Sequence, residues 1–175
     1  MQRIKDEAWR KLATNYPLRF VLRASWRDVD AYRHVNNVAQ AAMMEEGRSS
    51  LCISALSLEV MMSPDGPCQV LVASTGLEYL AQCNYPGEVL IAAGFSRIGR
   101  TSFNTAGALF QDGRCVAFCE TVMVYTIDGK PHALTDALQR QMQRPDLSCT
   151  TFAPHSRSNP AKIPSPSPTH KITSA

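Results

Sequence analysis

Four strand-like runs follow one another between residues 69 and 125, and they limit the folds open to this chain more than any other feature. The runs cover residues 69–79, 88–98, 101–111 and 114–125, with short polar turns between them. Asp112-Gly113, in the last turn, is a strong hairpin signal, since both central residues of the favoured tight turn have positive φ. Closely spaced strands joined by such turns predict an antiparallel sheet.

A long apolar stretch precedes these strands. Residues 38–56 are predicted to form a helix that is apolar around most of its circumference in the first two turns, which indicates burial on several sides. Gly47 costs such a helix roughly 1 kcal/mol relative to alanine, so we expect another stretch of backbone to pass close to it. A further strand is predicted at residues 18–27. This combination of elements predicts an α+β layer architecture.

The ten residues from Asp28 to Asn37, between the first strand and the helix, hold two carboxylates, an imidazole and two carboxamides. A carboxylate can take a proton from water or attack a carbonyl carbon, and the amides of a helix start can polarise that carbonyl. Asp30 and the amides near Asn36 and Asn37 could supply both functions. In the alternative interpretation, Asp28 or Asp30 caps the turn and His34 only satisfies backbone groups.

The pattern Asp-x-Asp-x-x-x-His-Val-Asn-Asn, followed by a helix that carries Glu45-Glu46-Gly47-Arg48, resembles the hotdog-fold acyl-CoA thioesterases of the 4-hydroxybenzoyl-CoA thioesterase type. The resemblance extends from about residue 16 to about residue 142 and is most specific over residues 26–37. It implies a hotdog fold, in which an antiparallel sheet wraps a long central helix. It also implies hydrolysis of acyl-CoA to a free acid and CoA, without a metal or redox cofactor.

The same resemblance assigns roles at the junction. Asp30 matches the essential carboxylate, which acts as nucleophile or as general base. Asn37 matches the residue whose backbone amide polarises the thioester carbonyl. His34 matches an active-site histidine of the plant acyl-carrier thioesterases, and Tyr32, where those enzymes have asparagine, is expected beside the substrate. Glu45 or Glu46 is the alternative carboxylate, as in other hotdog branches, unless this run forms ion pairs at a dimer interface.

The turn between the second and third strands of the series carries candidate contacts to CoA. Arg97, Arg100, Thr101 and Ser102 could bind its phosphates or pantetheine, because guanidinium groups bind phosphate well. A solvated hairpin end is the alternative. Hotdog domains pair so that two sheets join, and each active site takes its helix junction from one chain and its strand residues from the other. The resemblance therefore implies a homodimer or a homotetramer.

Two other functions stay open. The first is a non-catalytic acyl-binding or scaffolding hotdog protein, because Tyr32 and Arg33 depart from the family pattern and many relatives have glycine at the second position. The second is a hotdog hydratase or dehydratase. The usual motif of those enzymes places Asn-Pro between the aspartate and the histidine, and Ala31 stands in that interval with Tyr32 and Arg33. This difference disfavours the second function.

Charge, cysteines and hydropathy limit partners and location. The net charge of +3 comes from the basic residues beyond position 149, so the first 149 residues are formally neutral and nucleic acid is not an expected partner. The 6 cysteines have no CxxC or zinc-like spacing, which predicts free thiols in a reducing compartment and no metal site. Cys115 and Cys119 are expected on one face of a strand. No run reaches the ~20 apolar residues of a membrane span, so we expect a cytoplasmic protein.

The chain divides into three parts by composition. Residues 1–15 form an N-terminal extension with a short amphipathic helix at residues 2–13, which is expected to pack on the sheet. The resemblance implies that residues 16–145 form the hotdog thioesterase domain. Residues 146–175 are a disordered Pro/Ser-rich tail, because such a sequence buries too little apolar area to offset its ordering entropy.

Overall fold

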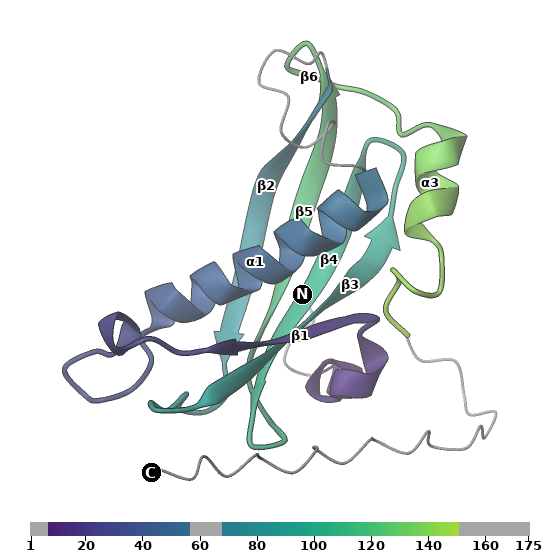
Figure 1. Ribbon diagram of the computed structural model, residues 1–175. Coiled ribbons are helices and arrows are strands. Elements are labelled where there is room, and N and C mark those ends of the chain that lie inside the picture. The colour runs from purple at the N-terminus through teal and green to yellow at the C-terminus, as the bar shows by residue number, and fades with distance from the viewer. Residues whose placement is uncertain (1–6, 57–67, 151–175) are drawn as a thin grey trace, which may run out of the picture.

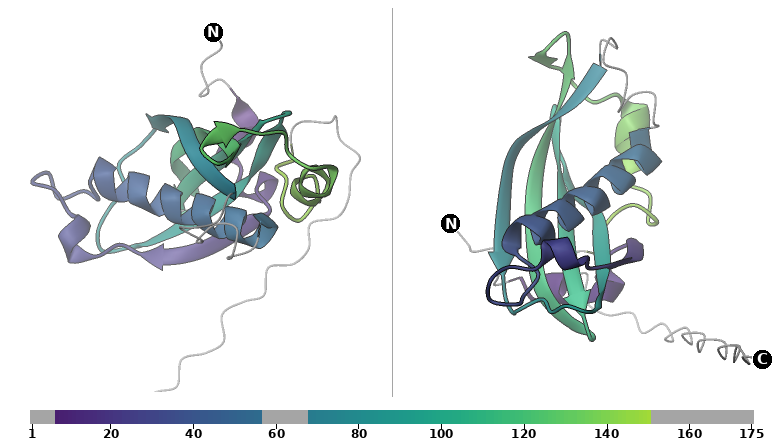
Figure 2. Two further views of the ribbon diagram at one scale, coloured as in Figure 1. Left: turned by 90° about the horizontal axis from the view of Figure 1, so that it is seen from above. Right: turned by 60° about the vertical axis from the view of Figure 1, so that its left-hand side comes forward.

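The computed structural model describes residues 7–56 and 68–150. The main elements in chain order are β1 (Leu18–Arg23), α1 (Asn37–Leu56), β2 (Cys68–Tyr79), β3 (Glu88–Ile98), β4 (Ser102–Gln111), β5 (Arg114–Ile127), β6 (Lys130–Pro131) and α3 (Asp136–Met142). Five strands form an antiparallel sheet in the order β1-β3-β4-β5-β2, and β6 pairs with β5. Figure 1 and the two further views in Figure 2 show α1 lying across one face of this curled sheet. The α+β architecture predicted from the sequence is therefore present.

The predicted elements agree closely with the observed ones. The strand predicted at residues 88–98 has those bounds in the structure, and α1 begins one residue earlier than predicted. β6 and α3 were not predicted. The Thr135 hydroxyl caps α3 by accepting from the Leu138 N–H at 3.2 Å, and Met142 at the end of α3 is fully buried.

The helix buries only one of its faces against the sheet. Its first half packs Met43 and Met44 against β3 and β4, and its second half packs Leu51 against the same strands. On the opposite face, Val38 is 75% exposed, and Ala41 and Ala42 are also exposed. The prediction of burial on several sides is therefore wrong for the single chain, because the sheet covers one side of the helix and α1 scarcely touches β2.

Gly47 on α1 packs directly against β3. A Cβ atom at this position would be 2.7 Å from Cγ2 of Ile91, a buried β-branched residue. The atoms within 4 Å of that position belong to the Ile91 and Ala93 side chains. Space at Gly47 is therefore tight, but the expectation that a backbone segment passes there is wrong, because side chains of β3 fill it.

We expect Gly47→Ala to destabilise the protein. The gain of about 1 kcal/mol in helix propensity is outweighed by an overpacking cost of about 1–3 kcal/mol, so the net loss should be about 1 kcal/mol. Urea unfolding followed by circular dichroism would measure the difference. A more stable variant would show that Ile91 moves aside without cost.

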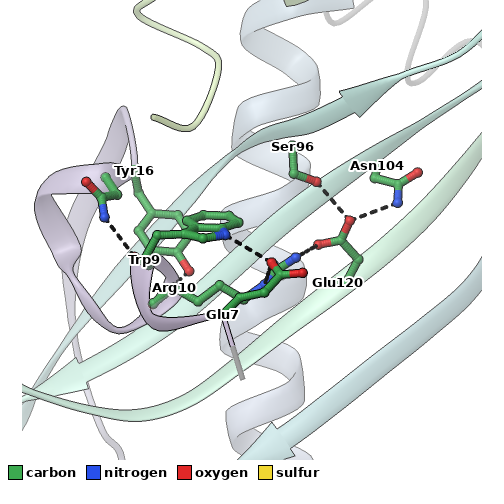
Figure 3. Close-up of polar contacts among 8 residues, drawn as sticks. Glu7, Trp9, Arg10, Tyr16, Ser96, Asn104 and Glu120 are labelled. Atoms are coloured by element: carbon green, nitrogen blue, oxygen red, sulfur yellow. Dashed lines mark hydrogen bonds and ion pairs between the residues drawn. The ribbon is translucent and has the colours of Figure 1, made fainter. Parts of the chain in front are cut away.

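The N-terminal segment covers the outer face of the sheet, opposite α1. Its described part forms two short 3-10 turns, η2 (Ala8–Lys11) and η3 (Ala13–Asn15), and not the single helix predicted; residues 2–6 lie outside the described residues. Trp9 and Tyr16 pack with the outward-facing apolar residues of β3, β4 and β5, and Figure 3 shows their polar neighbours. The predicted packing of this extension on the sheet is confirmed.

The chain stays on the sheet beyond the boundary expected at residue 145. The Phe95 N–H donates to the Leu147 carbonyl at 2.9 Å, and the Cys149 N–H donates to the Phe95 carbonyl at 2.8 Å. Leu147 and Cys149 are buried. These residues, which composition assigned to the tail, thus belong to the folded part of the chain, because their apolar side chains complete the core. The remaining tail, residues 151–175, lies outside the described residues.

A β-bulge at Val116 separates Cys115 from Cys119. The register of β5 against β4 shifts there, so Cys115 packs in the outer cluster while Cys119 packs under α1. The prediction of a shared face is wrong, because a bulge adds a residue and reverses the side-chain alternation. All six cysteines are free. Burial raises the pKa of the Cys115 and Cys119 thiols to about 11, which makes them poor nucleophiles at neutral pH.

Candidate active site

The polar junction folds as a tight loop between η4 (Trp26–Asp28) and α1. Asp28 closes the beginning of this loop: its Oδ2 accepts from the Ser25 N–H at 2.8 Å, and its carbonyl accepts from the Asn36 N–H at 2.8 Å. Val29 and Val35 form an antiparallel bridge inside the loop. Asp28 is therefore a turn residue, as its position in the sequence suggested.

Asp30 uses one carboxylate oxygen to hold the loop. Its Oδ1 accepts from the backbone N–H groups of Tyr32 and His34, at 2.8 and 3.2 Å. The Asp30 N–H in turn donates to the His34 carbonyl at 2.9 Å. The side chain is half-buried, and in the described part of the chain no hydrogen bond reaches Oδ2. This second oxygen is available to a substrate or a water molecule.

Arg33 and Tyr32 form the tip of the loop. Arg33 has a φ of 66°, in the left-handed region that glycine adopts freely. Arginine adopts the same conformation at a cost of roughly 1–2 kcal/mol, and its N–H donates to the Asp30 carbonyl at 3.0 Å. Tyr32 is 82% exposed. Both departures from the family pattern therefore lie on the surface beside Asp30, where a ligand can reach them.

The start of α1 presents two free amides. The Asn36 side chain accepts from the Ala39 N–H at 2.7 Å, and its carbonyl accepts from the Gln40 N–H at 3.1 Å. Among the described residues, the N–H groups of Asn37 and Val38 have no acceptor, and both residues are exposed. Such amides at a helix N-terminus favour an oxygen atom that carries negative charge.

His34 lies between the two parts of this site. The residue is half-buried, and its backbone forms an antiparallel bridge with Asn84. Val35, the next residue, donates its N–H to the Cys83 carbonyl at 2.8 Å. The structure thus brings Asp30, His34 and the helix start together in one loop, as the sequence predicted.

Two further residues at the junction were not selected from the sequence. Tyr79, the last residue of β2, donates its hydroxyl to the Asn37 carbonyl at 3.0 Å. Gln40 is buried and donates its Nε2 to the Val35 carbonyl at 2.9 Å, while its Oε1 is buried without a described partner. Gln40 could have been found as a polar residue on the helix face that Met43 and Met44 share. The Tyr79 contact has no local signal, since it joins residues 42 positions apart.

The other candidates lie elsewhere in the chain. The β3–β4 turn and the strand ends beside it carry Arg97, Arg100, Thr101 and Ser102. Figure 1 shows this turn near the C-terminal end of α1 and far from the junction. The apolar residues that flank this turn pack with the second half of the helix. A single chain therefore does not bring these four residues to Asp30.

The two helix glutamates differ in their surroundings. Glu45 forms an ion pair with Arg48, at 2.7 Å between Oε1 and Nη2. Glu46 lines a cavity of about 300 Å³ between β1, the loop and α1, together with Asp28 and Met43. Glu46 is thus the less engaged of the two and stays the alternative carboxylate.

In residues 7–56 and 68–150, no three His, Cys, Asp or Glu side chains gather where they could hold a metal ion. The helices of the same residues are too short or too polar to cross a membrane.

The chain belongs to the thioesterase-like superfamily, whose pattern it matches over residues 24–146. This match contains the polar junction, α1, the four long strands β2 to β5, β6 and α3. A comparison with curated proteins gave no match. The family named from the junction motif is therefore confirmed.

Solved structures of known proteins resemble this chain. The PA5185 protein from Pseudomonas aeruginosa is 24% identical with a TM-score of 0.68, over 81% of this chain and 99% of that one. A thioesterase from Thermus thermophilus, solved with coenzyme A and Zn, is 25% identical with a TM-score of 0.65, over 74% and 94%. A 1,4-dihydroxy-2-naphthoyl-CoA thioesterase from Synechocystis is 17% identical with a TM-score of 0.64, over 73% and 96%. With the family match, these likenesses confirm the hotdog fold.

Proposed function

We propose that this protein hydrolyses acyl-CoA to a free carboxylic acid and CoA. Membership of the thioesterase-like superfamily and the coenzyme A bound to the Thermus thermophilus relative support this activity. The observation that carries the proposal is the free Oδ2 of Asp30 in the same loop as two unpartnered helix amides. A carboxylate that activates water or attacks the carbonyl, and amide donors that stabilise its oxygen, are sufficient groups for hydrolysis of a thioester.

The reaction follows from the chemistry of these groups. The thioester carbonyl oxygen accepts hydrogen bonds from the Asn37 and Val38 amides, which stabilise the negative charge that develops on it. Asp30 Oδ2 either takes a proton from an attacking water molecule or attacks the carbonyl carbon itself, and water then releases the acid. The C–S bond breaks in either case, and CoA leaves as a thiol after protonation. His34, in the same loop, is our candidate for the transfer of that proton.

A homodimer formed through the edge strand β2 would complete the site. β2 is an end strand of the sheet, and Leu71 and Val72 on its two faces are about half exposed. An exposed edge of this length pairs readily with a second copy. Two β2 strands paired antiparallel place the Cys68 end of one copy beside the Tyr79 end of the other. The β3–β4 turn of one chain, with Arg97 and Arg100, then approaches the junction of its partner.

We expect Val72→Lys to break this dimer and to lower activity. Val21→Lys is the matched control, because Val21 lies on the opposite edge strand β1 and is 51% exposed, against 49% for Val72. Light scattering after size-exclusion chromatography would give the mass of each variant. A dimeric Val72→Lys protein, or dissociation of the control alone, would exclude β2 as the interface.

Thiol release from a panel of acyl-CoAs tests the proposed activity. The panel runs from acetyl-CoA through palmitoyl-CoA to benzoyl-CoA, since neither the chain length nor the acyl class is fixed by the loop. Release above the uncatalysed rate supports hydrolysis and gives the acyl preference. If a folded protein released no thiol from any member of the panel, hydrolysis of acyl-CoA would be contradicted, and acyl-carrier substrates or acyl binding without catalysis would be favoured.

We also propose a location for the protein. Its free thiols fit the reducing cytoplasm.

A further inference from the structure

The hydroxyl of Tyr79 ties the edge strand β2 to the start of α1. Its Oη donates to the Asn37 carbonyl at 3.0 Å, and among the described side chains this is the hydrogen bond that joins these two elements. The helix packs mainly on β3 and β4 and scarcely touches β2. Apolar packing therefore does little to hold the helix start against this strand, and the tyrosine contact does so instead.

The contact acts on one particular amide. The carbonyl of Asn37 and the N–H of Val38 belong to the same peptide unit. A hydrogen bond accepted by the carbonyl polarises that unit and makes its N–H a stronger donor. The Val38 N–H is one of the two amides at the helix start that have no acceptor in the described part of the chain. Tyr79 therefore strengthens a donor that is free to bind a ligand.

We propose that Tyr79 is a positioning residue of the active site, which orients and polarises the Asn37–Val38 peptide so that the Val38 N–H stabilises the thioester oxygen as negative charge develops on it. This inference rests on the proposed hydrolysis of thioesters. It assigns the hydroxyl no direct contact with the substrate, because its proton is engaged by the Asn37 carbonyl. Burial also raises the pKa of the Tyr79 hydroxyl, so the group keeps its proton at neutral and mildly alkaline pH.

Tyr79→Phe removes the hydroxyl and retains the ring. We expect kcat to fall about 3- to 10-fold with KM unchanged, which is less than the ~100-fold or greater loss on removal of an oxyanion donor, because the Val38 amide is weakened and not deleted. Tyr85→Phe is the matched control. Tyr85 packs edge-on against Trp26 at 5.7 Å between ring centroids, and no hydrogen bond of its hydroxyl occurs in the described residues.

A second measurement, the chemical shift of the Val38 amide proton, tests the contact between Tyr79 and Asn37 independently of catalysis. In the intact, isotope-labelled protein, the amide proton signal of Val38 should move upfield in Tyr79→Phe and stay in place in Tyr85→Phe, because the weaker donor is less polarised. A fall in kcat together with this shift supports the proposal. An unchanged kcat, an effect on KM alone, or a fall in kcat with an unmoved Val38 signal would overturn it.

The two measurements also separate this inference from the proposed function. If the wild-type protein releases no thiol from any acyl-CoA, hydrolysis fails and the catalytic part of this inference fails with it. A shifted Val38 signal in that case would still establish that Tyr79 polarises the helix start. Active wild type with equally active Tyr79→Phe would instead leave hydrolysis standing and reject the role of Tyr79.

Discussion

Exchange of Asp30 for asparagine should lower thioester hydrolysis by at least about 100-fold and leave the fold intact. Asparagine can neither take a proton from water at neutral pH nor attack the thioester as a carboxylate does. The effect should fall on kcat, because the helix amides that bind the carbonyl oxygen are unchanged. Thiol release measured over a range of acyl-CoA concentrations would separate kcat from KM.

Asparagine is the informative substitution because Asp30 also holds the loop. Its Oδ1 accepts from the N–H groups of Tyr32 and His34, and an asparagine oxygen can accept the same two bonds. Alanine would remove both acceptors and mix a folding effect with a catalytic one. Asp28→Asn is the control, because it removes a carboxylate charge two residues from Asp30. The side-chain oxygen at this position accepts from the Ser25 N–H in the turn, and the asparagine oxygen can do the same. Equal turnover by Asp30→Asn and wild type would remove Asp30 from the mechanism.

The loop around Asp30 could be predicted because its signals are local. Two aspartates and two asparagines before an apolar helix favour a turn and a helix cap whatever the rest of the chain does. The structure shows this arrangement, with Asn36 as the capping residue and Oδ1 of Asp30 inside the turn. The local signals did not show that Oδ1 of Asp30 is bound inside the turn while Oδ2 stays free among the described residues. That difference between the two oxygens appears only when the loop is folded.

Contacts between distant segments could not be predicted in the same way. The pairing of Tyr79 with Asn37 depends on the strand order, which puts β2 at an edge with its last residue at the helix start. The bulge at Val116 has no composition signal, yet it moves Cys115 to the outer face. The apolar pattern of the helix predicts burial on several sides, but in the single chain Val38 on α1 is 75% exposed.

The ion pair beneath the N-terminal segment is another such contact. Arg10 is 4% exposed, and its Nη2 forms an ion pair with Oε2 of Glu120 on β5 (Figure 3). The two atoms lie within ion-pair distance but do not have the geometry of a hydrogen bond. Arg10 Nε also donates to Glu7 at 2.8 Å. Ser96 and Asn104 donate to the other oxygen of Glu120 at 2.9 and 2.8 Å. Burial alone would lower the pKa of Arg10, but the charges of Glu120 and Glu7 outweigh it and raise that pKa above its ordinary value.

Replacement of Arg10 by methionine should destabilise the protein by about 3 kcal/mol. Methionine is similar in length and preserves apolar packing, so the main change is that the Glu120 carboxylate stays buried on the sheet without its cation. Removal of one partner of a buried pair is costly because the other charge is left uncompensated. Urea unfolding of both proteins at neutral pH would measure the loss as a lower midpoint.

Two further variants show whether the buried charge is the cause. Addition of Glu120→Gln to Arg10→Met should restore most of the lost stability, since glutamine is neutral and can still accept from Ser96 and Asn104. Arg23→Met is the matched control, because it breaks an ion pair with Glu88 in which the two side chains are 84% and 60% exposed. Such surface pairs contribute about 0–1 kcal/mol. A loss in Arg10→Met no larger than in the control would show that the N-terminal segment is held by its apolar contacts alone.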